Sequence, residues 1–150
     1  MGISDDAVEA RAQGWRALAA LHARLESRIE RALQAEHGLS VSEYTVLDVL
    51  SRQDGWHMRM QQLASAVVLS QSATTRLVTR LEDQGHLSRY LCDTDRRGIY
   101  TEVSESGQEL LARARPTHDR ALSEALDEAT AMPELEPLAR ALVQLPQPIA

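Results

Sequence analysis

The segment from Ser70 to Arg80 holds the side chains best suited to bind another molecule. Apolar residues recur there at helical spacing, which predicts a helix from Gln71 to Gln84 with one polar face. An α-helix fits the DNA major groove, where Arg bonds guanine, Gln bonds adenine and a Thr methyl contacts the thymine methyl. Taken alone, the polar face could equally be an ordinary solvated surface. The expected contacts carry hydroxyl, amide or guanidinium groups: Ser70, Gln71, Ser72, Thr74, Thr75, Arg76 and Arg80.

A second group of cations lies in a charged turn. Alternating β-branched and aromatic residues predict strands at 87–91 and 99–103, joined by a tip that contains the adjacent Arg96 and Arg97. Arg89, at the base of this hairpin, is consistent with a DNA contact or with a structural role. A short helix, a tight turn, the helix at 71–84 and a hairpin form the order of a winged helix-turn-helix.

The elements that must position these groups are mainly helical. Apolar residues at three- or four-residue steps predict a long helix over 8–33 that ends at Gly38. The capping-box spacing of Ser40 and Glu43 begins a second helix, which stops near Asp54. Residues 56–59 suffice for one short strand.

Further helices complete the predicted order. A short third helix covers 62–67, and helical stripes return after Glu105 and over 135–145, with a kink expected just before Pro116. The fold class is therefore mainly α with a small β-hairpin wing, in the order α-α-β-α-α-β-β-α-α.

The charge distribution is uneven. The net charge of −6 opposes DNA binding at first sight, because affinity for DNA depends on cations that neutralise phosphates. Only the middle segment, residues 70–100, has more Arg than acidic residues, and the chain has no Lys. This distribution is typical of an acidic helical scaffold that carries a local basic patch.

Several protein classes are excluded by absent motifs. Cys92 is the single cysteine, so no intrachain disulfide forms, and we interpret it as a small strand residue with oxidant sensing as the alternative. The histidines lack metal-ligand spacing, and no nucleophile motif or phosphate loop is present, so we expect no metal, no cofactor and no enzyme. The chain shows neither a signal peptide nor an apolar run of membrane-spanning length, which predicts a soluble, cytoplasmic protein without membrane contacts.

The segment from Leu63-Ala64 through Arg76-Leu77-Val78-Thr79-Arg80-Leu81-Glu82-Asp83-Gln84-Gly85-His86-Leu87 resembles the helix-turn-helix of the MarR family. The run Asp95-Arg96-Arg97-Gly98, followed by Glu102-Val103-Ser104-Glu105-Ser106-Gly107, resembles the wing of that family. The resemblance implies that Arg97 enters the minor groove, that Arg96 lies on phosphate and that Asp95 orients a basic neighbour. A narrow A·T minor groove attracts a guanidinium through its enhanced negative potential, which is consistent with this role for Arg97.

The resemblance also implies an architecture for the whole chain. It predicts a single domain over 1–150, with dimerisation helices at 8–37 and 105–145 and a winged-helix DNA-binding lobe at 40–104. The long apolar stripes at both ends are what an interleaved, obligate-type homodimer requires. Met60 and Gln61 stand where many relatives have a capping Ser or Thr, so we expect the third helix to begin irregularly.

The predicted function is sequence-specific binding to double-stranded DNA at an inverted-repeat operator, as a repressor released by a small-molecule effector. A helical protein–protein interaction module without DNA binding is the alternative. The resemblance implies a small aromatic or phenolic effector in a cleft between the dimer helices and the lobe. Candidate pocket residues, for which ordinary packing is the alternative, are Trp15, His22, Tyr44, Asp48, Trp56 and Arg59.

Overall fold

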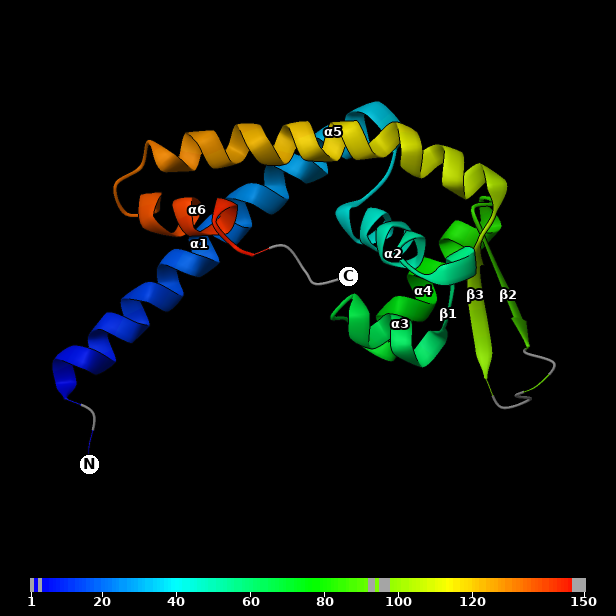
Figure 1. Ribbon diagram of the computed structural model, residues 1–150, viewed down its shortest axis with the longest axis horizontal. Coiled ribbons are helices and arrows are strands. Elements are labelled where there is room, and N and C mark those ends of the chain that lie inside the picture. Colours follow the sequence, from blue (N-terminus) through cyan, green and yellow to red (C-terminus); the bar gives the residue numbers. More distant parts are fainter. Residues whose placement is uncertain (1, 3, 92–93, 95–97, 147–150) are drawn as a thin grey trace. The chain divides into compact units, whose positions relative to one another are not determined.

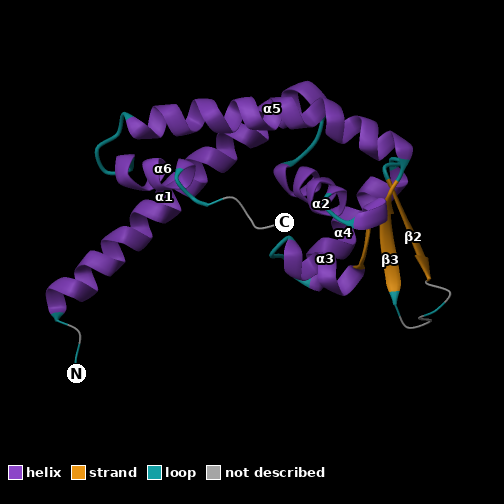
Figure 2. Cartoon of the chain, viewed as in Figure 1, coloured by secondary structure: helices purple, strands orange, loops and turns teal. Residues whose placement is uncertain are grey.

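The computed structural model describes residues 2, 4–91, 94 and 98–146 of the 150-residue chain (Figure 1). Helices dominate, and the strands gather at one side of α2, α3 and α4 (Figure 2). The order of elements confirms the predicted one. The elements in chain order are α1 (Asp5–His37), α2 (Val41–Ser51), the 3-10 turn η1 (Asp54–Trp56), β1 (His57–Arg59), α3 (Met60–Ala66), α4 (Gln71–Asp83), β2 (Leu87–Leu91), β3 (Ile99–Val103), α5 (Glu105–Thr130) and α6 (Glu136–Val143).

Contacts within the chain divide it into two compact units. We call Leu33–Thr117 the lobe, and we call Met1–Ala32 together with His118–Ala150 the terminal-helix unit. Because α1 and α5 are long, each contributes residues to both units. The predicted single domain over 1–150, with dimerisation helices at 8–37 and 105–145 and a DNA-binding lobe at 40–104, stays a prediction.

The lobe has a closed apolar core beneath α2, α3 and α4. Burial of each such Val or Leu side chain contributes about 1.5–3 kcal/mol to folding. These side chains fix the position of α4 from its inner face. The Val and Leu side chains of the lobe that are at most 2% exposed are Leu33, Leu39, Val46, Leu47, Leu50, Leu63, Val78, Leu81 and Leu111.

The sheet of the lobe has three antiparallel strands in the order β1-β3-β2. Met58 of β1 pairs with Thr101 of β3, and Tyr90 of β2 pairs with Tyr100 of β3. Leu87 and Val103, a pair at the base of the hairpin, are both buried. The sequence predicted all three strands, and the structure adds that β1 extends the hairpin along its β3 edge.

The segment between α2 and β1 differs from the prediction. Helix α2 ends at Ser51 rather than near Asp54, and a separate 3-10 turn covers Asp54–Trp56. Gly55 and Trp56 both have positive φ, of +72° and +57°. Positive φ is incompatible with a β-strand. Trp56 therefore belongs to the turn, and β1 begins at His57.

The start of α5 packs closely on the turn that follows α4. The Ser104 backbone N–H donates to the His86 carbonyl at 3.0 Å, and the Ser104 hydroxyl donates to the Gly85 carbonyl at 2.6 Å. A Cβ added at Gly107 would collide with the His86 carbonyl oxygen and approach Val103 Cγ1 to 2.7 Å. Gly107 therefore allows two backbone segments to touch. Helix α5 continues from there as a single helix that contains Pro116.

The terminal-helix unit has a small core of its own. Leu21 of α1, Ala129 of α5, Leu135 and Ala139 are each at most 2% exposed. Beside this core, Arg28 of α1 donates hydrogen bonds to the Glu128 carboxylate of α5 at 2.7 and 2.9 Å and to Glu124 at 3.2 Å. These contacts join α1 to α5.

Candidate nucleic-acid interface

The turn between α3 and α4 sets the start of α4. Val68 has a φ of +57°, and the Leu69 N–H donates to the Ala64 carbonyl at 3.2 Å, so the chain reverses within a few residues. The Ser70 hydroxyl then accepts from the Ala73 N–H at 3.1 Å, which confirms the predicted N-cap. At the other end, Gly85 takes a φ of +83° just after the helix, as its predicted position required.

The first turns of α4 present polar side chains to solvent. The Thr75 hydroxyl donates to the Gln71 carbonyl at 2.9 Å, and the Thr75 side chain remains exposed. Ser70 at the cap completes this surface. The exposed predicted contacts on α4, which we call the α4 polar face, are Gln71, Ser72, Thr75, Arg76 and Arg80.

Thr74 does not belong to the α4 polar face, so its prediction as a DNA contact is wrong. Its side chain is fully buried, and its hydroxyl donates to the Ser70 carbonyl at 2.9 Å. That local bond satisfies the hydroxyl inside an apolar environment. Thr74 lies four residues before Val78, on the face of α4 that packs into the core.

One exposed cation of α4 lies close to a buried carboxylate of α2. The Glu43 side chain is only 4% exposed, and its Oε1 lies 3.9 Å from Nη1 of Arg80, whose side chain is 62% exposed. The same Oε1 accepts from the Ser40 N–H at 3.0 Å, while the Glu43 N–H donates to the Ser40 hydroxyl, confirming the predicted capping box. One carboxylate thus caps α2 and attracts a guanidinium of α4.

Arg89 at the base of the wing has a structural partner. Its guanidinium and its backbone N–H all donate to the Glu82 carboxylate, at 2.9–3.3 Å. Hydrogen bonds from Arg89 lower the pKa of Glu82, and the same bonds raise the pKa of Arg89. This ion pair ties the end of α4 to β2 and supports the structural interpretation of Arg89.

The wing tip carries the remaining predicted contacts. Cys92, Asp95, Arg96 and Arg97 lie outside the described residues. Their predicted roles therefore rest on the sequence. The described strands do place the ends of this tip, Leu91 and Gly98, in the same lobe as the α4 polar face.

A pocket of about 430 Å³ opens beside the α4 polar face. Arg59, which was predicted to line an effector cleft, is one of its lining residues, and its effector role stays a prediction. Gln61 and Gly98, which the sequence analysis did not predict as binding residues, also contribute. The pocket is lined by Arg59, Met60, Gln61, Gln71, Thr75, Arg89, Gly98 and Ile99.

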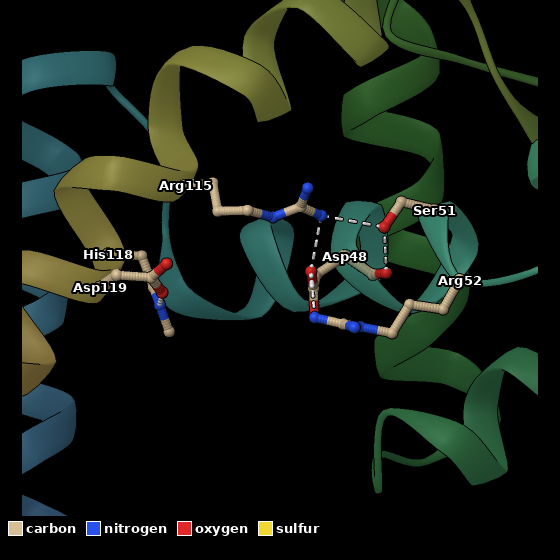
Figure 3. Close-up of polar contacts among 6 residues, drawn as sticks. All are labelled: Asp48, Ser51, Arg52, Arg115, His118 and Asp119. Atoms are coloured by element: carbon tan, nitrogen blue, oxygen red, sulfur yellow. Dashed lines mark hydrogen bonds and ion pairs between the residues drawn. The ribbon is translucent and has the colours of Figure 1, made fainter. Parts of the chain in front are cut away.

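Asp48, another predicted effector residue, contacts a side chain that the sequence analysis did not single out (Figure 3). Nη2 of Arg115 on α5 donates to Asp48 Oδ1 at 2.9 Å and to the Ser51 hydroxyl at 3.0 Å. Burial lowers the pKa of Arg115, but hydrogen bonds to Asp48 and Tyr44 outweigh it and raise the pKa above its usual range. Asp48 also binds Arg52, so one carboxylate serves two guanidinium groups.

The six predicted effector residues divide between the two units. Trp15 and His22 lie on α1 in the terminal-helix unit. Trp15 is 71% exposed, and Nδ1 of His22 lies 3.7 Å from Oε2 of Glu26. Tyr44, Asp48, Trp56 and Arg59 belong to the lobe, where Trp56 is half-buried. Within the lobe, Tyr44 and Asp48 share Arg115, whereas Arg59 lines the pocket beside α4.

Among the described residues, no group of three or more His, Cys, Asp or Glu side chains could hold a metal ion. No described helix combines the length and the apolarity needed to cross a membrane. The described part of the lobe combines a polar helix face, a short helix before it and a three-stranded wing. Together these define a winged helix-turn-helix.

Comparison with known proteins refines this class. Residues 37–98 match the model of the MarR family. AbsC, a MarR family transcriptional regulator from Streptomyces coelicolor, is 30% identical in sequence with a TM-score of 0.74, and the alignment covers 95% of this chain and 93% of AbsC. This chain belongs to the MarR family.

Two further relatives are a regulator solved in complex with DNA and a curated repressor. Sco3205, a MarR family regulator from Streptomyces coelicolor solved in complex with DNA, is 25% identical with a TM-score of 0.75, over 96% of this chain and 87% of Sco3205. Transcriptional repressor MprA from Escherichia coli is 29% identical over 98 residues, or 65% of this chain and 54% of MprA. The chain spans little more than half the length of the curated relatives that it matches.

Proposed function

We propose that this chain is a transcription regulator that binds double-stranded DNA in a sequence-specific manner. The observation that carries the proposal is the α4 polar face, which begins at a capped helix N-terminus and lies in one lobe with a wing. Free N–H groups at such an N-terminus attract phosphate, while Gln and Arg side chains beyond it read base edges. Sco3205, solved with DNA, supports the same role.

The sharpest test of base reading is Arg76→Ala. Arg76 is exposed on the second turn of α4, so its loss should relax base preference at one position per half-site and cost on the order of 1–3 kcal/mol of binding energy. Equilibrium titrations on single-base operator variants measure this directly. An equal loss on every sequence would make Arg76 a phosphate contact instead.

The wing supplies a second contact in this proposal, through Arg97. Arg97→Ala should weaken binding most at operators with A·T-rich flanks, and Arg97→Lys should restore only part, because an ammonium is costlier to desolvate. Folding should change by less than about 0.5 kcal/mol in either variant. If Arg97→Ala binds A·T-flanked and G·C-flanked operators as tightly as the wild type, the wing does not read the groove.

A homodimer is the form in which we expect the chain to act. The terminal-helix unit leaves large apolar side chains exposed on both α1 and the end of the chain, among them Trp15 and Val143. Two copies related by a two-fold axis would bind an inverted repeat whose half-sites lie about one helical turn, roughly 10 bp, apart. Light scattering at low micromolar concentration should give a dimer mass, and inserting about 5 bp between half-sites should abolish tight binding.

The regulator acts as a repressor, in line with the name of the similar MprA, and a small aromatic or phenolic effector releases it from DNA. The network of Tyr44, Asp48 and Arg115 offers such a ligand a phenol, a carboxylate and a guanidinium in the lobe. Shift assays on DNA flanking its own gene, with and without candidate phenols, test both statements. We assign no catalytic role to the chain, and we expect it in the cytoplasm, where it can reach the chromosome.

The second candidate function is a protein-binding module that uses the α4 polar face. Salt separates the two, because phosphate contacts weaken steeply with ionic strength and a mostly apolar protein interface does not. A steep salt dependence of operator affinity supports the DNA-binding function. Absence of any DNA binding at low salt would favour the module.

A further inference from the structure

The outer face of the three-stranded sheet carries a cluster of three aromatic side chains and one guanidinium. Side chains alternate between the faces of a strand, and the pairing register places four of them together. His57 and Arg59 come from β1, Tyr100 from β3 and Tyr90 from β2. We call these four residues the wing cluster. Its members belong to all three strands, so their contacts can hold the three strands in fixed positions relative to one another.

The contacts within the wing cluster are specific. Tyr90 and Tyr100 are directly opposed across β2 and β3, and their rings stack with centroids 5.8 Å apart and planes 18° apart. His57 meets the Tyr100 ring edge-on, with centroids 5.6 Å apart, and its Nδ1 lies 3.2 Å from the Tyr90 hydroxyl. Aromatic pairs opposed in this way stabilise a particular strand register.

Arg59 connects the wing cluster to the helix-turn-helix. It is the N-cap residue of α3, the first helix of that motif, and it supplies no side-chain cap bond there. Its guanidinium turns to the sheet instead: Nε donates to the Tyr100 hydroxyl at 3.1 Å, and Cζ lies 5.7 Å from the Tyr100 ring centroid. Tyr100 therefore joins the hairpin that bears the wing tip to the residue from which α3 starts.

Ordinary core packing does not account for this arrangement. Tyr90 is 38% exposed, and the outer face of the sheet is opposite to the one that carries the buried Leu87, Thr101 and Val103. A β-branched side chain would occupy the same strand positions with high β-propensity. What two tyrosines add is a pair of hydroxyl groups with fixed partners, one on His57 and one on Arg59.

We infer that Tyr90 and Tyr100 are positioning residues that hold the wing in a fixed relation to the helix-turn-helix. The inference rests on the proposed DNA-binding function. A DNA contact by the wing and a contact by α4 reinforce each other only when their spacing matches one DNA molecule. The wing cluster fixes that spacing from the outer face of the sheet.

The experiment compares Tyr100→Val and Tyr100→Phe with the wild type. Each protein is titrated at one salt concentration on operators with A·T-rich flanks, on operators with G·C-rich flanks and on scrambled DNA. Tyr100→Val removes the stack and the bond to Arg59, and should lower the preference for A·T flanks to less than about a third of the wild-type ratio. Its preference for operator over scrambled DNA should persist, because α4 is unchanged.

Tyr100→Phe keeps the stack and removes only the hydroxyl, so it should fall between Tyr100→Val and the wild type. It also keeps the inference falsifiable if Tyr100→Val does not fold. Ser88→Ala, an exposed residue on the same face of β2, is the matched control and should leave the ratio unchanged. In an Arg97→Ala background, Tyr100→Val should have no further effect on the ratio, because the group being positioned is gone.

The outcomes separate the inference from the function on which it rests. If the wild type prefers A·T flanks and both Tyr100 variants keep that preference in full, the wing cluster is a structural cluster and the inference is overturned while the function stands. If the wild type does not distinguish operator from scrambled DNA, the proposed function fails and the inference fails with it. A loss that persists in the Arg97→Ala background would also overturn the inference.

Discussion

In the lobe, Leu47, Leu50 and Leu81 are fully buried, whereas in the terminal-helix unit Trp15 is 71% exposed and Val143 is 72% exposed. The lobe encloses its core with its own elements, although Val68 in the turn before α4 and Leu91 and Ile99 at the ends of the hairpin strands are exposed. The terminal-helix unit has a core of a few small and medium side chains and leaves larger ones uncovered. Exposed apolar surface of this kind marks interaction sites in folded proteins. From this comparison we expect folding stability to depend mainly on the lobe, and we propose that association depends on the terminal helices.

The largest effect should follow from emptying the core of the lobe. Leu81→Ala removes a fully buried side chain that holds α4 and should lower the free energy of unfolding by about 2–5 kcal/mol. Urea unfolding followed by circular dichroism measures the change. Leu91→Ala, at a position of the lobe that is 63% exposed, is the control for the same loss of side-chain atoms. A Leu81→Ala effect below about 0.5 kcal/mol would show that the core of the lobe is not closed.

A smaller effect, confined to association, should follow from a change on α1. Trp15→Ala should raise the dissociation constant of the dimer by about tenfold or more, because aromatic side chains carry much of the energy of an interface. Sedimentation over a concentration series checks it. Arg16→Ala is the matched control, since Arg16 is its neighbour on α1 and forms an exposed ion pair with Glu9. Equal dissociation constants for Trp15→Ala and the wild type would place the interface elsewhere.

The smallest effect concerns the ion pair at the base of the wing, and it depends on pH. Hydrogen bonds from Arg89 lower the folded-state pKa of Glu82, so the pair stabilises the fold fully above the unfolded-state pKa of about 4.5. That contribution is lost as the pH falls through the lower, folded-state pKa. Glu82→Gln should therefore be less stable than the wild type by up to about 1 kcal/mol at pH 7, with the difference shrinking below pH 4.5.

Thermal or urea unfolding of the two proteins between pH 3 and pH 7 makes this comparison. A difference that grows on acidification would contradict the assigned direction of the pKa shift. The pair is confined to the lobe, so Glu82→Gln should leave the dimer dissociation constant unchanged. This separation of effects is what the contrast between the two units predicts.

The sequence predicted the elements well wherever a local signal exists. The capping box of Ser40 and Glu43, the cap at Ser70 and the left-handed Gly85 each act within four residues, so their types alone indicate where helices begin and end. Thr74 was misassigned because a hydroxyl can be satisfied by its own helix and then be buried like an apolar side chain. Periodicity of polarity cannot distinguish that state from exposure.

The contacts that define the sites could not be predicted in the same way. Arg115 reaches Asp48 across 67 positions of sequence, and Arg59 reaches Tyr100 across 41. The residues near Arg115 in sequence do not specify its partner, because the contact with Asp48 depends on how α5 packs against α2. The pairing of β1 with β3 has the same origin. Local patterns therefore predicted the elements of the site, and packing decided which side chains meet.

Gly107 has a practical consequence for protein engineering. Replacing a glycine within a helix by alanine is a standard stabilising substitution, because it reduces the entropy of the unfolded chain and favours helix formation. At Gly107 the sign is reversed: the new methyl group would strike the His86 carbonyl oxygen, a backbone atom that cannot rotate away. A saturation library at position 107, selected for thermal stability, should return only the parental residue. Automated stabilisation schemes that score helix propensity alone would choose alanine there and displace α5 from the end of α4.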